Sequence, residues 1–351
     1  MEHIDRTRPV MVTGATGYLA GWIVKALLEQ GLTVHATVRD PGARAKVAHL
    51  VALGEAGPGK LRLFKADLLQ EGSFDAAAEG CSVIFHTASP FVTAVKDPQR
   101  DLVDPAVKGT LNVLGAANRA TSVERVVLTS SCAAIYGDAA DTSRAPGGQL
   151  TEAVWNTTSS LSHNAYSLSK TLAEQAAWKM AGAQDRWRLV AVNPALIIGP
   201  ALNPDPTSEV FDLVRQLVDG RMRTGAPDLE LGVVDVRDVA EAHLRAAFLP
   251  QANGRNIVFE RSASILDMAD ALRAAGDGRL KLPRGKLPNW LVKLVGPLAN
   301  PLFTRAWLAQ NLGHPWRASN AKAVRELGLT FRPFDASIRE MVAQMMDRRG
   351  S

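Results

Sequence analysis

Short apolar runs alternate with longer stretches of helical periodicity along the first 260 residues. Residues 9–13 form an apolar run, a glycine-rich turn follows, and residues 19–30 place apolar side chains at helical spacing before Gly31. Residues 32–38 then return to a composition rich in β-branched side chains. Because parallel strands need a crossover helix of this length, the pattern predicts a β-α-β unit.

The same alternation continues along the chain. Further short apolar runs lie at 61–64, 82–85, 125–128, 188–192 and 255–259, and helical stretches at 103–120 and 166–183 separate some of them. Continuous apolar runs of this length are typical of strands that helices bury on both faces. The sequence therefore predicts an α/β fold with a doubly wound parallel sheet (Rossmann) of six or seven strands.

The character of the chain changes after Pro194. Proline and glycine interrupt residues 194–232, and Pro283, Pro288, Pro297 and Pro301 break the tail. We expect residues 1–193, together with about 232–260, to form one domain around the parallel sheet. Residues 194–231 and 261–351 are expected to form a smaller C-terminal substrate lobe over the strand ends, where open α/β sheets bind ligands.

Charge and cysteine content narrow the class of protein. The 40 Lys and Arg residues are scattered among 35 acidic ones, which disfavours nucleic acid as a partner and fits a phosphorylated cofactor. Cys81 and Cys132 lie far apart, which argues against a disulfide framework or a zinc site and favours the cytoplasm. The polar N-terminus argues against a secretory signal. No apolar run of about 20 residues predicts a membrane span.

The first turn carries a dinucleotide-binding pattern. Gly14 allows a sharp turn out of the first strand, and Gly17 removes a side chain where the backbone approaches a pyrophosphate at the helix N-terminus. The small side chain of Ala20 lets the helix pack close to the sheet. The predicted cofactor-binding residues of this turn are Thr13, Gly14, Thr16, Gly17, Tyr18 and Leu19.

The end of the second strand indicates which cofactor binds. An enzyme specific for NAD usually has an acidic residue there, whereas this chain has Arg39, with Lys46 seven residues on. A guanidinium pairs well with a 2′-phosphate, so NADP(H) is the predicted cofactor. Asp40 leaves NAD open, although Asp40-Pro41 is typical of a turn.

Tyr166 and Lys170 are four residues apart in a helical stretch, so both side chains lie on one helix face. We expect the ammonium of Lys170, together with the positive charge of an oxidised nicotinamide, to lower the pKa of the Tyr166 phenol. Lys170 is also expected to hold the ribose hydroxyls of the cofactor. The hydroxyls of Thr129, Ser130 and Ser131 follow the strand at 125–128 and are expected to point into the same crevice. Ser131 would bond the substrate carbonyl oxygen. The predicted catalytic residues are Ser131, Tyr166 and Lys170, without a metal.

The chain resembles the extended short-chain dehydrogenase/reductases, and among them the dihydroflavonol reductase, cinnamoyl-CoA reductase and aldehyde reductase group. The matching segments are 12–18, 37–41, 66–68, 86–90, 129–131, Tyr166 with Lys170, 193–194 and 234–239. The resemblance implies that Asp67 bonds the adenine amine and that Leu68 contacts the ring. It further implies that Thr87, Ala88 and Ser89 line the cofactor. Arg39 and Lys46 would bind the 2′-phosphate, and Pro194 and Ile197 would contact the nicotinamide. Ala20, where many members have glycine, and residues 132–135 depart from the family pattern; the second departure puts a flavonoid substrate in doubt.

These features predict an NADPH-dependent reductase of aldehydes and ketones. The apolar segments 195–206, 211–225 and 288–316 favour substrates with bulky apolar groups, whereas Arg215, Arg221 and Arg223 keep a nucleotide-sugar or a CoA thioester open. Two alternatives are a sugar-nucleotide epimerase or dehydratase and a non-catalytic NADP-sensing protein. A homodimer is left open.

Several other residues are open to two interpretations. His86 is interpreted as a packed histidine and His163 as a loop residue, although His163 lies close enough to Tyr166 to touch substrate. Trp290, Trp307 and Trp316 suit either core packing or a substrate wall. The segment 288–312 is interpreted as a packed part of the lobe rather than an interfacial membrane helix.

Overall fold

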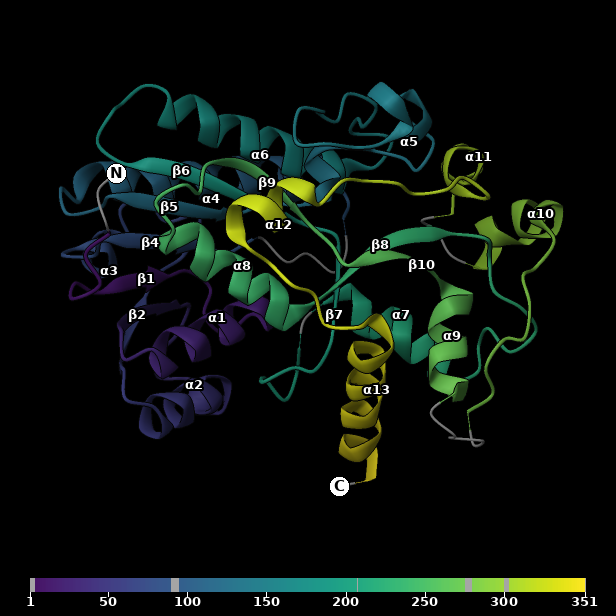
Figure 1. The fold of residues 1–351 in the computed structure, drawn as a ribbon, viewed down its shortest axis with the longest axis horizontal. Helices are drawn as coiled ribbons and strands as arrows, with labels where there is room; N and C mark the ends of the chain where they lie inside the picture. The colour runs from purple at the N-terminus through teal and green to yellow at the C-terminus, as the bar shows by residue number, and fades with distance from the viewer. Residues whose placement is uncertain (1–3, 90–94, 207, 275–279, 300–302, 351) are drawn as a thin grey trace.

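The computed structural model describes residues 4–89, 95–206, 208–274, 280–299 and 303–350. Pro90, which ends one matching segment, and Pro301 lie outside them. The main sheet contains seven strands, all paired in parallel, in the order β3-β2-β1-β4-β5-β6-β9 (Figure 1). Its strands are β1 (Val10–Val12), β2 (Thr33–Val38), β3 (Lys60–Lys65), β4 (Val83–His86), β5 (Arg125–Thr129), β6 (Arg188–Pro194) and β9 (Gly254–Val258). The predicted fold class is confirmed, including the return of the last strand to this sheet.

Helices cover both faces of the main sheet. One face carries α1 (Tyr18–Glu29), α2 (Arg44–Ala56) and α8 (Val236–Phe248), and the other carries α3 (Asp75–Ala78), α4 (Asp104–Arg119) and α6 (Ala165–Ala181). In β1, Val10 and Val12 pack into the core on the α1 side, while Met11 packs into the core on the α4 side. This two-sided burial explains why the strands are continuous apolar runs rather than alternating ones.

The strand order reverses between β1 and β4. From β1 the chain builds outward through β2 and β3, and then returns to place β4 on the other side of β1. Connections that leave in opposite directions open a crevice beyond the carboxyl ends of the two strands, where doubly wound folds bind their ligands.

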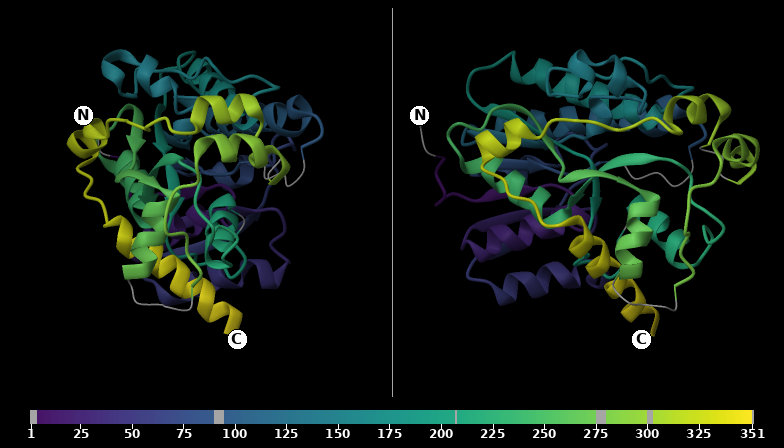
Figure 2. Two further views of the ribbon diagram at one scale, coloured as in Figure 1. Left: turned by 90° about the vertical axis from the view of Figure 1, so that its right-hand side faces the viewer. Right: turned by 45° about the vertical axis from the view of Figure 1, so that its right-hand side comes forward.

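A second, three-stranded sheet in the order β10-β8-β7 lies beyond this edge (Figure 2). It contains β7 (Leu196–Ile198), β8 (Glu230–Asp235) and β10 (Arg261–Ser264). The helices of this part of the chain are α7 (Glu209–Val218), α9 (Ile265–Ala274), α10 (Asn289–Ala299), α11 (Arg305–Asn311) and α13 (Phe334–Gly350), and α12 (Ala321–Leu327) returns to pack on β9 and α8. The short elements η1 (Gln99–Val103), η2 (Cys132–Ala134), α5 (Asp141–Arg144) and η3 (Pro146–Gly148) complete the chain.

Candidate active site

The turn after β1 has the backbone geometry of a phosphate-binding loop. Gly14 has a φ of 63°, and a Cβ built there would lie 3.0 Å from the Cβ of Ala88. Gly17 precedes α1 and has no side chain with which to cap the helix. The N–H groups at the start of a 12-residue helix are therefore available to an anion, as a pyrophosphate requires.

Thr13 and His86 hold the segment that faces this turn. Thr13 Oγ1 accepts the backbone N–H groups of Thr87 (3.1 Å) and Ala88 (3.0 Å) and lies 3.1 Å from His86 Nδ1. Burial, and then the charge of Lys170, lower the pKa of His86 to about 3, so its imidazole is neutral. His86 is a packed, hydrogen-bonded histidine, as the sequence predicted. Both Thr13 and His86 position residues 87–89.

The other residues of the turn contact the rest of the protein through their side chains or carbonyl groups. The buried Tyr18 hydroxyl donates to the Gly199 carbonyl at 2.7 Å, and Leu19 is also buried. The Thr16 carbonyl accepts the Asn203 amide at 3.0 Å. Tyr18 and Leu19 can therefore meet a cofactor only through the backbone at the start of α1.

Arg39 and Lys46 are exposed beyond the end of β2, and neither makes an ion pair within the part of the chain that the structure describes. Asp40 Oδ1 accepts the N–H of Gly42 at 2.8 Å, so this acid serves the turn, as expected. Two unpaired cations at the adenosine end of the crevice suit a 2′-phosphate.

The loop after β3 carries Asp67 and Leu68. The Asp67 carboxylate accepts the N–H of Leu69 at 2.8 Å, and Asn112 of α4 donates to the Leu68 carbonyl at 3.1 Å. Leu68 packs against Gly109, where a built Cβ would lie 3.1 Å from the leucine side chain. The loop is thereby fixed on α4, beside the crevice.

Ser131, Tyr166 and Lys170 meet at the carboxyl end of β5. Ser131 accepts the N–H of Ala133 at 3.1 Å, and its hydroxyl lies near enough to the Tyr166 phenol to lower the pKa of that group. Lys170 Nζ donates to Ser89 Oγ at 3.1 Å and lies 5.8 Å from the centre of the Tyr166 ring. Pro194 ends β6 and is buried, and Ile197 lies half-buried in β7. A hydroxyl, a phenol and an ammonium thus converge on one side of the crevice.

The pKa of Tyr166 differs from the expected direction. Desolvation is the larger cause that raises the pKa of this phenol above its ordinary value, and Glu209 raises it further, while the Ser131 hydrogen bond opposes both. The predicted lowering by Lys170 is therefore wrong for the protein alone. Because Tyr166 is 52% exposed, solvent screens Glu209, and only the direction of the shift bears on the chemistry. Burial lowers the pKa of Lys170 to about 8.

Contrary to our expectation, the hydroxyls of Thr129 and Ser130 bond other groups, although both residues line the pocket that Ser89 and Lys170 also line. Thr129 Oγ1 lies 2.7 Å from His243 Nε2 of α8, and Ser130 donates to Glu174 at 2.5 Å. Successive residues of an extended strand point to opposite faces, so the three hydroxyls cannot share one direction. Ser131 is the one of the three whose side chain acts on the pKa of Tyr166 within the described residues.

Glu174 joins the elements around the site, a role that no local pattern in the sequence predicts. It lies one helical turn after Lys170, is 1% exposed, and accepts hydrogen bonds from Ser130, Trp178 and Asn193. Arg255 of β9 pairs with it at 2.7 Å. The carboxylate therefore ties α6 to β5, β6 and β9, and so fixes the helix that carries Tyr166 and Lys170.

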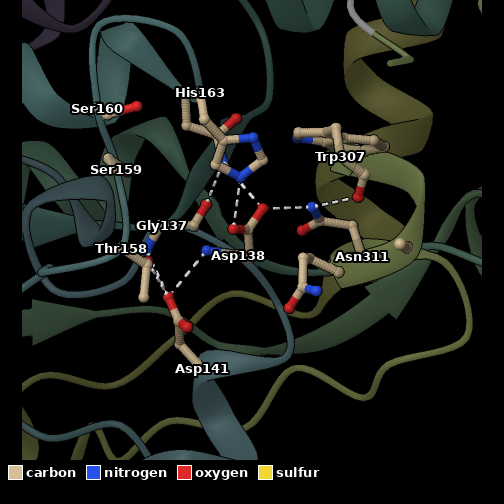
Figure 3. A network of polar contacts seen from close by, with 12 residues as sticks. Gly137, Asp138, Asp141, Thr158, Ser159, Ser160, His163, Trp307 and Asn311 are labelled. Carbon is tan, nitrogen blue, oxygen red and sulfur yellow. Dashed lines mark hydrogen bonds and ion pairs between the residues drawn. The ribbon is translucent and has the colours of Figure 1, made fainter. Parts of the chain in front are cut away.

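A second polar cluster, here called the Asp138 network, holds the start of α6 (Figure 3). Asp138 accepts from His163 (2.7 Å), from Asn164 (2.9 Å) and from Asn311 of α11 (2.6 Å). Asn164 has a φ of 55° and lies two residues before Tyr166. The network therefore links the C-terminal part of the chain to α6, the helix that carries Tyr166. His163 belongs to it.

The tryptophans have different environments. Trp316 is 1% exposed and packs on Gly232 of β8, whereas Trp290 is 68% exposed. Trp307 stacks on Phe303 with the ring centres 5.2 Å apart. The described residues contain no group of three or more metal-ligating side chains, and no helix among them is long and apolar enough to cross a membrane.

Residues 10–260 match the NAD dependent epimerase/dehydratase family, and the chain belongs to this family. It is similar to a cinnamoyl-CoA reductase from Medicago truncatula, with 40% identity over 343 residues that cover 97% of this chain and 96% of the relative. A putative anthocyanidin reductase from Ginkgo biloba is 40% identical over 296 residues, covering 81% and 83%.

Solved structures of a reductase and of a second protein share the fold of this chain. The yeast methylglyoxal/isovaleraldehyde reductase Gre2, solved with NADPH, has a TM-score of 0.77 and 28% identity and covers 97% of this chain and 99% of its own. MoeE5, solved with UDP-glucuronic acid and NAD, is 21% identical with a TM-score of 0.69 and shares the fold.

Proposed function

We propose that the chain is an NADPH-dependent reductase that converts aldehydes and ketones to alcohols. The observation that carries this proposal is the convergence of Ser131, Tyr166 and Lys170 at the carboxyl end of β5, beside a glycine turn that leaves a helix N-terminus available to an anion. The reductases among its relatives, and the NADPH bound to the yeast neighbour, support the reaction and the cofactor.

The residues present fit this cofactor. A Cβ at Gly14 would collide with Ala88, and Arg39 and Lys46 have no partner among the described residues, so both ends of the proposed site suit phosphate groups. Thr16, Gly17 and the backbone of Tyr18 and Leu19 would hold the pyrophosphate, and Asp67 and Leu68 the adenine. Thr87, Ala88, Ser89, Pro194 and Ile197 would line the nicotinamide half. When bound, NADPH supplies the hydride.

The chain's own residues would orient the substrate and move the proton. Ser131 and Tyr166 would both donate hydrogen bonds to the carbonyl oxygen, and Tyr166 would give up its proton as negative charge develops there. A raised pKa keeps this phenol protonated at neutral pH, as a proton donor must be. Lys170 would hold the ribose and stabilise the phenolate that forms.

We further propose a division of labour within the chain. Residues 1–193 with about 232–260 would bind the cofactor, and 194–231 with 261–351 would bind the substrate. The cytoplasm suits the two buried cysteines, which are not in a disulfide. A homodimer is compatible with this division.

A panel of carbonyl compounds, followed by loss of NADPH absorbance, tests the function. We expect a benzaldehyde-like carbonyl to give a higher kcat/KM than a UDP-sugar or an acyl-CoA under the same conditions. Clear preference for either charged substrate would overturn the substrate class. Failure to oxidise NADPH with any carbonyl would favour the non-catalytic alternative, and a purified protein that retains NAD would favour an epimerase.

A further inference from the structure

One segment of this chain contains basic residues but no acidic ones. Between Asp277 and Glu326 the sequence contains no acidic residue. The basic residues in that interval are Arg279, Lys281, Arg284, Lys286, Lys293, Arg305, Arg317, Lys322 and Arg325. The whole chain has 40 basic and 35 acidic residues, so without these nine the remainder carries 31 against 35 and is net negative.

The same segment contains an apolar helix face that is exposed among the residues that the structure describes. Trp290, Leu294 and Leu298 follow one another at intervals of four on α10 and are 68%, 62% and 90% exposed. Among the described residues, Leu69 is the only other large apolar side chain that is more than 60% exposed. Side chains at this spacing share one face of a helix, so the three form a continuous stripe, here called the α10 stripe.

The opposite side of α10 attaches it to the protein. Val292 and Gly296 are buried, and Val292 packs in a cluster with Leu229, Leu308 and Leu312. Figures 1 and 2 place α10 at the outer edge of the molecule, away from the main sheet. The stripe is therefore a fixed outer surface of a packed helix.

Cations surround the α10 stripe. Lys293 is exposed on α10 itself, and Arg305 is exposed at the start of α11, which contacts α10. Arg284 and Lys286 are exposed just before α10 begins, and Lys286 pairs with Asp228 at 2.6 Å. An apolar stripe with tryptophan at one end and cations at its edges has the composition of a helix that lies in a lipid interface.

The packing of α10 through Val292 agrees with the interpretation of 288–312 as a packed part of the lobe, but its exposed stripe leads us to a different view of the outer side. We propose that α10 docks this protein on the surface of an anionic lipid bilayer. Trp290, Leu294 and Leu298 would enter the boundary between headgroups and acyl chains, while Lys293 and the neighbouring cations would contact the lipid phosphates. With 11 residues, α10 is too short to span a bilayer, so the association is with one surface. A second copy of the chain is a poorer occupant, because two segments of like charge would face each other.

Vesicle flotation of the full chain tests the proposal. At low salt we expect the full chain to bind vesicles of equal parts phosphatidylglycerol and phosphatidylcholine. Binding to phosphatidylcholine alone should be weak, and added salt should weaken the binding.

Leu294→Glu should reduce binding by at least about tenfold, because it places a charge in the stripe. Val324→Glu, a matched change at an apolar side chain of α12 that is 44% exposed, should leave binding unchanged. Lys293→Glu should weaken binding more than Lys108→Glu on α4.

Tryptophan emission identifies the inserting face. Vesicle binding should shift the emission to shorter wavelength, and Trp290→Phe should bind equally well with a smaller shift. Equal binding to both vesicle types, or equal loss in Leu294→Glu and Val324→Glu, would overturn the proposal. A dimer that Leu294→Glu separates would assign the stripe to a second copy instead. A raised substrate KM in Leu294→Glu, with vesicle binding intact, would assign it to the substrate pocket.

Discussion

The surroundings of Tyr166 and Lys170 shift the pKa of both residues proposed to handle the proton. Desolvation of the phenol raises the pKa of Tyr166, although the residue is 52% exposed, and burial lowers the pKa of Lys170 to about 8, because each effect favours the neutral form. The Lys170 ammonium donates a hydrogen bond to Ser89. Its charge therefore lies next to the residues proposed to line the cofactor. Lys170, rather than Tyr166, is then the group that titrates near neutral pH.

This assignment predicts the pH dependence of the reaction. Lys170 is charged below pH 8 and loses its proton as the pH rises through that value, while Tyr166 stays protonated. We expect kcat/KM for carbonyl reduction to be highest below about pH 8 and to fall above it. Lys170→Arg should have lower activity but no such fall, because a guanidinium stays charged. An identical alkaline limb in both proteins would contradict the assignment.

Arg39 determines the predicted choice of cofactor. NADPH should give a kcat/KM at least tenfold above NADH, a difference of about 1.4 kcal/mol, because the guanidinium meets the 2′-phosphate. Arg39→Asp should shrink or reverse the ratio. Lys60→Asp, an exposed cation at the opposite end of the neighbouring strand, is the control and should leave the ratio unchanged. A native enzyme that prefers NADH would refute the assignment.

At the scale of elements, α6 is held at both ends of its catalytic turn. The Asp138 network fixes its start through Asn164, and Glu174 fixes the turn after Lys170 through Arg255.

The spacing of Tyr166 and Lys170 was visible in the sequence because a helix brings residues four apart together. Asp138 and Asn311 are 173 positions apart, and Glu174 and Arg255 are 81 apart. No local pattern records such pairs, which is why sequence reasoning missed both.

The Asp138 network makes a prediction for Asn311. Asn311→Ala removes a donor to Asp138 and the acceptor of the Ala139 N–H, both in a buried setting. The free energy of unfolding should fall by about 1–3 kcal/mol, and kcat should fall more than cofactor affinity. Urea unfolding and steady-state kinetics measure the two effects. Gln310→Ala is the matched control, since the Gln310 side chain bonds Arg144 at the surface and its backbone carbonyl is retained. Equal effects in both variants would count against the network.

At the scale of the molecule, local patterns predicted the main sheet and the turn after β1, but not the three-stranded sheet. β8 follows a proline- and glycine-rich stretch, and its partners β7 and β10 are short. Trp316 secures this sheet to the segment after α11 by packing on Gly232. A contact between a glycine and a distant tryptophan leaves no periodic signal in the sequence. Both interpretations of Trp316, core packing and a substrate wall, therefore stayed open. The structure places it in the core.

The same contact predicts the effect of a single methyl group. A Cβ at Gly232 would lie 2.3 Å from the Trp316 ring, so Gly232→Ala must displace a buried indole. The free energy of unfolding should fall by about 1–3 kcal/mol, as for other overpacked cores. Gly285→Ala, where a Cβ would meet nothing within 4 Å, should be close to neutral. Chemical denaturation compares the two, and equal stabilities would show that the sheet relaxes freely around Trp316.

The most direct test of the proposed reaction is single-turnover oxidation of bound NADPH by native protein and by Tyr166→Phe, with a carbonyl substrate that the native enzyme reduces. The variant should bind NADPH with unchanged affinity and lose about 10²–10⁴ of the rate of the chemical step, the usual contribution of a positioned proton donor. Near-native turnover by Tyr166→Phe, with the chemical step shown to be limiting, would contradict the account.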